Sequence, residues 1–153
     1  MKKILLFALS LMVMCAVSCG KNLGDGTINA TTTYVGELPQ LTDDTTCEYY
    51  ICDLSQQDFI ETLTQQIHDA YSNSNYQGCI DLAETLKTTI PVFHREFCMD
   101  SHLVYNITAG TYILMSERDI YCAGGIAPMF KYKMIQVESD KTTSVAFVFD
   151  DIY

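Results

Sequence analysis

The fold of this chain is decided by residues 55–91, SQQDFIETLTQQIHDAYSNSNYQGCIDLAETLKTTIP. Ser55 can cap a helix, and Asp58 follows it three residues later in the first turn. Apolar side chains then recur at helical spacing and predict a helix over about 55–72, namely Phe59, Ile60, Leu63, Ile67 and Ala70. The polar run at 72–75 breaks this pattern.

A second amphipathic pattern predicts a helix over about 76–88 and stops before Pro91. Its apolar positions are Tyr76, Cys79, Ile80, Ala83 and Leu86. Because only a short polar connection separates the two patterns, we expect a helical hairpin.

After Pro91 the pattern changes to short runs typical of β-strands. They suggest two hairpins, Leu103–Thr108 with Thr111–Ser116 and Met129–Glu138 with Thr143–Phe149. The sequence therefore predicts an α+β fold, in which an N-terminal helical hairpin packs on an antiparallel sheet of about four strands.

The N-terminus has the features of an export signal. Lys2 and Lys3 precede an almost unbroken apolar run, Ile4–Val17, which is short for a membrane span of about 20 residues. We therefore expect residues 1–18 to be a signal peptide.

The run ends in Ala16-Val17-Ser18-Cys19, followed by Gly20. This resembles the lipobox of bacterial lipoproteins, in a form similar to that found in Bacteroidetes. The resemblance implies that Cys19 becomes the acylated first residue and anchors the chain to a membrane of the cell envelope, either the outer membrane or the cell surface. An ordinary cleaved signal and an uncleaved anchor are the alternatives.

Residues 19–46 are rich in Gly, Asn, Thr and Asp, and they predict a lipidated N-terminus and flexible tether. Residues 47–153 then form a single globular domain. The precursor carries a net charge of -10, and removal of Lys2 and Lys3 makes the mature chain more acidic still. Since phosphate binding needs clustered basic residues, this charge disfavours nucleic acid as a partner.

Five cysteines follow Cys19, and in an exported chain they are candidates for disulfides: Cys47, Cys52, Cys79, Cys98 and Cys122. Cys47 and Cys52 could form a local bridge before the first helix, and Cys79 could join the second helix to Cys98 or Cys122. An odd count leaves one thiol over, and the pairing stays open.

His94, Cys98 and His102 are spaced by four residues. If this segment were helical, the three side chains would share one face and could bind zinc, or Cys98 could act as a nucleophile with a histidine base. An exported cysteine more often forms a disulfide, so we expect neither a catalytic residue nor a metal or other cofactor.

The sequence thus predicts a lipid-anchored, non-enzymatic module that binds a protein or a glycan in the envelope. The alternative is a small hydrolase or metal-binding enzyme that uses His94, Cys98 and His102.

Overall fold

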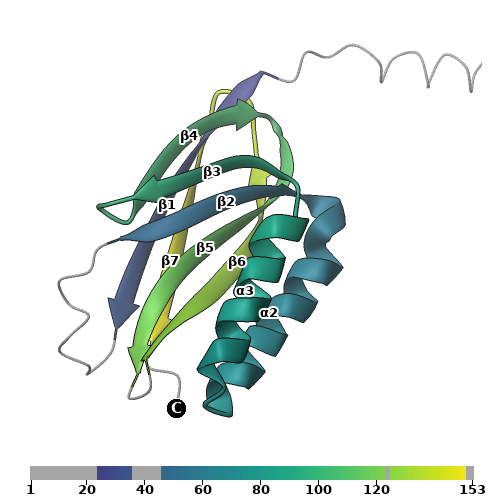
Figure 1. The fold of residues 1–153 in the computed structure, drawn as a ribbon. Helices are drawn as coiled ribbons and strands as arrows, with labels where there is room; N and C mark the ends of the chain where they lie inside the picture. Colours follow the sequence, from purple (N-terminus) through teal and green to yellow (C-terminus); the bar gives the residue numbers. More distant parts are fainter. Residues whose placement is uncertain (1–23, 36–45, 123–124, 151–153) are drawn as a thin grey trace, which may run out of the picture.

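The computed structural model describes residues 24–35, 46–122 and 125–150, with the backbone alone at 121, 122 and 125. The predicted signal peptide and Cys19 lie outside these ranges. Figure 1 shows the elements, which in chain order are β1 (Asp25–Val35), β2 (Cys47–Asp53), the 3-10 turn η1 (Leu54–Gln56), α2 (Gln57–Ser72), α3 (Tyr76–Thr89), β3 (Val92–Cys98), β4 (His102–Thr108), β5 (Gly110–Cys122), β6 (Gly125–Val137) and β7 (Thr142–Asp150). Within these ranges, no helix is both long and apolar enough to span a membrane.

The strands form two sheets. The four-stranded sheet has the order β3-β2-β5-β6 and is antiparallel throughout, whereas the three-stranded sheet has the order β4-β1-β7. In the three-stranded sheet β1 pairs antiparallel with β4 and parallel with β7. The two helices lie side by side on one face of the four-stranded sheet, and β1 and β7 cross behind its other face (Figure 1). The molecule therefore has three layers, with β2 and β5 in the middle.

Both predicted helices are confirmed. α2 buries Ile60, Leu63 and Ile67, and α3 buries Cys79, Ala83 and Leu86, each set at the spacing of one helical face. The side chain of Asn75 accepts a hydrogen bond of 3.1 Å from the backbone N–H of Gly78, which caps α3.

The α+β class is correct, but the arrangement within it differs from the prediction. The helices are not N-terminal, because β1 and β2 precede them, and the described strands exceed the predicted four. β1 forms from residues that were predicted to be part of a flexible tether. Its inward side chains are small or β-branched, and Ile28, Ala30 and Thr32 are buried between two neighbouring strands.

Neither predicted hairpin forms, although strands do occupy all four predicted segments. β4 pairs with β1 instead of β5, and β7 also pairs with β1 instead of β6. The hairpin that does form joins β5 to β6. Residue 109 and residues 138–141 are therefore connections between sheets, which the local sequence pattern does not distinguish from turns.

The interior between the sheets combines aromatic and hydroxyl side chains. The ring of Tyr49 on β2 packs against Phe147 on β7, with centroids 6.4 Å apart. The Thr32 hydroxyl on β1 lies 2.8 Å from the Tyr49 hydroxyl and 2.7 Å from the Ser116 hydroxyl. These contacts join the three-stranded sheet to the four-stranded sheet.

The β6 and β7 edges of the two sheets face one another without a ladder of backbone hydrogen bonds. Lys131 and Lys133 of β6 donate to the carbonyls of Val148 and Ala146 on β7, over 2.6 and 2.7 Å. A gap of about 560 Å³ lies along this boundary. The lysine side chains thus bind part of the β7 edge that no strand covers.

Candidate binding cleft

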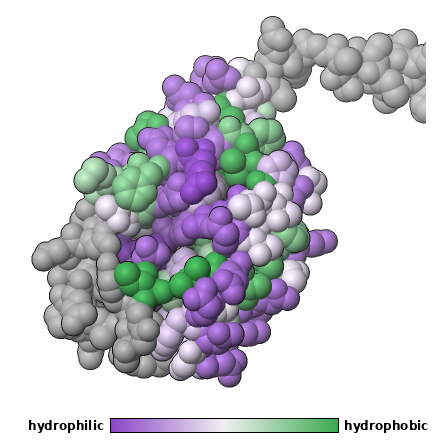
Figure 2. Space-filling view, viewed as in Figure 1, coloured by the Kyte–Doolittle hydropathy of each residue, from purple (hydrophilic) through white to green (hydrophobic). Residues whose placement is uncertain are grey.

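A cleft of about 370 Å³ opens between α3 and the uncovered part of the four-stranded sheet. α3 forms one wall through Ile80, Ala83, Glu84 and Lys87, and Phe97 of β3 lies on the opposite side. The floor and far end comprise Thr46, Cys47, Glu48, Glu117, Arg118, Asp119, Ile126 and Pro128. Figure 2 shows a hollow on this face, with hydrophilic residues inside it and hydrophobic residues around it.

The floor holds a chain of charged and polar contacts that spans three strands and α3. Arg95 on β3 binds Glu48 on β2 with both Nε and Nη2, at 2.5 and 3.0 Å. The Tyr50 hydroxyl lies 2.7 Å from Glu48 and also contacts the carboxylate of Glu117 on β5. Lys87 on α3 completes the chain with a 2.8 Å ion pair to Glu117.

The pKa values of Glu117 and Glu48 are shifted in opposite directions. Burial raises the pKa of Glu117, although hydrogen bonds from Lys87 and Tyr50 oppose the rise. Burial also acts on Glu48, but hydrogen bonds from Arg95 and Tyr50 outweigh it and hold its pKa below the ordinary value. A phenol has one proton to donate. The Tyr50 hydroxyl lies within donating distance of both carboxylates, so its single proton serves either Glu48 or Glu117 at any one time.

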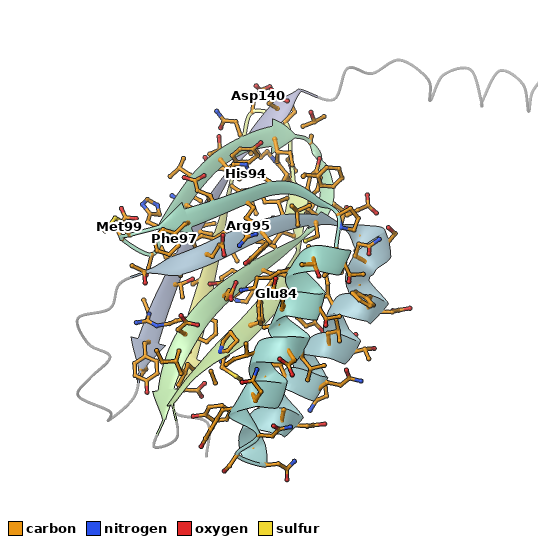
Figure 3. The ribbon with its side chains drawn as sticks, in the orientation of Figure 1. Glu84, His94, Arg95, Phe97, Met99 and Asp140 are labelled. Atoms are coloured by element: carbon orange, nitrogen blue, oxygen red, sulfur yellow. The ribbon has the colours of Figure 1, made fainter. Side chains whose placement is uncertain are left out.

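The rim adds apolar groups and further acidic groups. Phe97 is 61% exposed, and Ile80 and Ile126 are also exposed. Glu84 on α3 and Asp119 on β5 are exposed lining residues. In Figure 3 the labelled residues Glu84, Arg95 and Phe97 lie around this opening, on α3 and β3. Carboxylates accept hydrogen bonds and an exposed ring offers an apolar face, so the cleft suits a small ligand that carries hydroxyl or amino groups.

The helix that a shared site of His94, Cys98 and His102 would require is not formed. His94 and Cys98 lie on β3, and His102 begins β4. His94 stacks on Tyr105 at 3.8 Å and bonds Glu96, whereas His102 bonds Asn29 at 2.8 Å. Among the residues whose side chains are described, no group of three or more His, Cys, Asp or Glu is placed to hold a metal ion.

Cys98 is also poorly suited to nucleophilic catalysis. Its side chain is buried, and burial together with nearby Cys47, Glu96 and Asp100 raises the pKa of its thiol to about 11. The thiolate is the reactive form, so near neutral pH the thiol stays protonated. The geometry therefore does not support the enzyme alternative based on these residues.

Among the cysteines with described side chains, Cys47, Cys52, Cys79 and Cys98, no disulfide is present in the structure, and all four are buried. The local bridge between Cys47 and Cys52 is wrong. The two lie five positions apart on one extended strand, which separates them by about 16 Å and turns their side chains to opposite faces. Cys79 does lie on the second helix, where its thiol contacts the Ile67 carbonyl at 3.5 Å. The side chain of Cys122 lies outside the described part.

The local sequence pattern does not mark the residues of the cleft as a group. Glu48, Arg95 and Glu117 stand in separate strands, and only the pairing of β2 with β3 and β5 brings them together. A local signal existed in the alternating pattern of residues 92–98, which places Phe93, Arg95 and Phe97 at alternate positions of a strand.

No known protein family matches the chain, and no curated protein matches it. Among solved structures, the chain is similar to the crystal structure of a candidate carbohydrate-binding protein from Pseudomonas aeruginosa, at 12% identity and a TM-score of 0.42. The match covers 86% of this chain and 93% of that one. This likeness is too distant to assign a fold family or a ligand.

Proposed function

We propose that this chain is a lipid-anchored binding protein of the bacterial cell envelope, and that its cleft binds a short glycan. The observation that carries the proposal is the cleft itself, which Phe97 of β3 and Glu84 of α3 both line and whose floor carries paired charges. The Arg95–Glu48 and Lys87–Glu117 pairs fix the floor, because each charged group is held by a partner on another element.

The size and chemistry of the cleft favour a glycan over other small ligands. Its volume falls within the usual range for small-molecule sites, about 300 to 1,000 Å³. Carboxylates such as Glu84 accept hydrogen bonds from sugar hydroxyls, and the Phe97 ring offers a flat apolar surface for the C–H face of a pyranose. A phosphorylated ligand is disfavoured, since the lining carboxylates Glu48, Glu84, Glu117 and Asp119 outnumber the cations.

Membrane attachment through Cys19 is the second part of the proposal. It rests on the lipobox-like Ala16-Val17-Ser18-Cys19 sequence. Metabolic labelling with a fatty acid tests it directly, since the intact chain should take up label and remain in the membrane fraction. A Cys19→Ala variant should lose both properties, and labelling that survives this substitution would contradict the anchor.

The glycan is tested by titrating the purified protein with short oligosaccharides of three kinds: neutral, amino-sugar-containing and uronic-acid-containing. Calorimetry should detect at least one ligand. Phe97→Ala should then weaken binding by about tenfold or more, because an aromatic contact and its buried area are lost. Glu84→Gln should weaken binding without changing the thermal midpoint.

Met134→Ala is the matched control. Met134 is 61% exposed, the same fraction as Phe97, but it does not line the cleft. Its substitution should leave affinity unchanged. Binding of no oligosaccharide by the folded protein, or binding that is insensitive to both Phe97→Ala and Glu84→Gln, would refute the glycan proposal.

A protein partner is the second candidate, and a different observation favours it. Phe97 and Met99 are 61% and 75% exposed, and they lie at the end of β3 that leads into the turn to β4. Figure 3 shows Phe97 and Met99 close together at that end of β3. Loss of a cross-linked envelope protein on Met99→Lys, with oligosaccharide binding intact, would identify this surface as the functional one.

A further inference from the structure

Cys47 and Cys98 are directly opposite one another in the antiparallel pair formed by β2 and β3. The Cα atoms of such partners are about 4.5 to 5.5 Å apart. Disulfides span Cα separations of about 4.4 to 6.8 Å, so the backbone already has the spacing that a bridge requires. Both residues are buried, with 3% and 5% of their surfaces exposed.

The two side chains also point to the same face of the sheet. Tyr49 lies two positions from Cys47 on β2, and alternate residues of a strand share a face. Tyr49 contacts Thr32 of β1 and Phe147 of β7, which identifies this face as the one toward the three-stranded sheet. As the cross-strand partner of Cys47, Cys98 shares that face.

The other described cysteines have different surroundings. Cys52 has the opposite orientation on β2, toward the helical layer, and its cross-strand neighbours are Val92 and Ile113. Cys79 belongs to α3 and contacts Ile67 of α2, so the four-stranded sheet separates it from Cys98. Within the described ranges, Cys47 and Cys98 are therefore the cysteines that share both a face and a register position.

We propose that Cys47 and Cys98 form a disulfide in the exported protein. The oxidant is a protein or small-molecule disulfide. One cysteine attacks it as the thiolate and forms a mixed disulfide, and the other cysteine then displaces the remaining oxidant thiol. Each cysteine loses its proton, one S–S bond forms in the chain, and the oxidant gains two electrons and is released as two thiols.

This bond would fix one side of the cleft. Next to the cysteines, Glu48 and Phe97 are also direct partners across β2 and β3, and both line the cleft on the opposite face of the sheet. A disulfide between Cys47 and Cys98 would therefore hold Glu48, in the floor of the cleft, and Phe97, at its rim, at a constant separation. The inference does not depend on which ligand the cleft binds.

Peptide mapping of the wild-type chain tests the proposal without any substitution. The full chain is expressed with its own signal in a bacterial host that has an oxidising envelope, its free thiols are alkylated on lysis, and it is digested without reductant. The expected result is a cross-linked peptide pair that contains Cys47 and Cys98 and separates on reduction. Alkylation of both residues after denaturation, or a bridge from either one to another cysteine, would overturn the proposal.

Serine variants supply the matched controls. Cys47→Ser and Cys98→Ser should each abolish the cross-linked pair, whereas Cys52→Ser and Cys79→Ser should retain it. Reduction of the wild-type protein should lower its thermal midpoint by roughly 10 °C, the shift expected for a bridge across a long loop. It should have no effect on Cys47→Ser, and an equal reductant-induced shift in that variant would place the stabilising bridge elsewhere.

Discussion

Glu48 and Glu117 are directly opposite one another in β2 and β5, and their carboxyl groups share the single hydroxyl of Tyr50. Two like charges at such a position repel. Arg95 offsets the charge of Glu48 and Lys87 offsets that of Glu117, so cations from β3 and α3 reduce the repulsion between the two carboxylates.

The two carboxyl groups should contribute to stability with opposite dependence on pH. The folded-state pKa of Glu117 is raised, so its contribution is greatest below the ordinary value of 4.5 and falls as the pH rises toward the raised pKa. The pKa of Glu48 is lowered, so its contribution is complete above 4.5 and is lost as the pH falls through the lowered pKa.

Urea unfolding of wild type, Glu117→Gln and Glu48→Gln between about pH 3 and pH 8 measures both effects. The free energy of unfolding of wild type minus that of Glu117→Gln should decrease with rising pH, and the same difference for Glu48→Gln should increase. Slopes of the same sign would contradict the opposite pKa shifts of the two carboxyl groups.

Gly26→Ala should destabilise the protein by about 1 to 3 kcal/mol, because the added methyl group meets backbone. A Cβ at position 26 would lie 2.2 Å from the carbonyl oxygen of Glu138. Gly24→Ala is the control, since its Cβ would meet the Ser139 side chain, which can rotate away. Equal losses in chemical denaturation would show that β1 tolerates a shift at Gly26.

Thr32→Val should cost about 1 to 3 kcal/mol, because Ser116 and Tyr49 both lose a buried hydroxyl partner while the side-chain shape is kept. Thr33 is exposed and lies next in the chain, so Thr33→Val should change stability by less than about 0.5 kcal/mol. Thermal unfolding measures both, and adding Ser116→Ala to Thr32→Val should cost less than the sum of the single changes.

Replacing Lys131 and Lys133 together with alanine should promote self-association, because two carbonyls of the β7 edge lose their donors. Size-exclusion chromatography with light scattering should detect dimers or larger species at high protein concentration. A Lys141→Ala variant also loses a positive charge, but in the turn beside Glu138, and should remain like wild type. Monomeric behaviour of the double variant would show that the β7 edge is protected by other means.

The sequence predicted what depends on neighbouring residues and missed what depends on distant ones. α2 and α3 follow from a 3.6-residue apolar period within one segment. β1 has few large apolar side chains, and its burial becomes apparent only when β4 and β7 are placed beside it. For the same reason the hairpins were mispaired, since adjacency along the chain is the default where long-range pairing is unknown.

The site shows the same division. The four-residue spacing of His94, Cys98 and His102 has meaning on a helix, but in strands it separates the side chains. The paired charges of the cleft come from four elements. In the sequence, each of these residues looks like an ordinary exposed charge. Cys47 and Cys98 are both disulfide candidates in the sequence, but only the register of β2 and β3 shows that they are cross-strand partners.

The parallel pairing of β1 with β7 joins the first described strand to the last one. β1 is the central strand of its sheet, so that sheet cannot close until β7, more than 100 residues after β1, has been synthesised. Contacts between such distant segments make folding slow and leave strand edges open in the meantime. Truncation within β7 would remove a neighbour of the central strand β1, so it should prevent folding more severely than the few lost residues suggest.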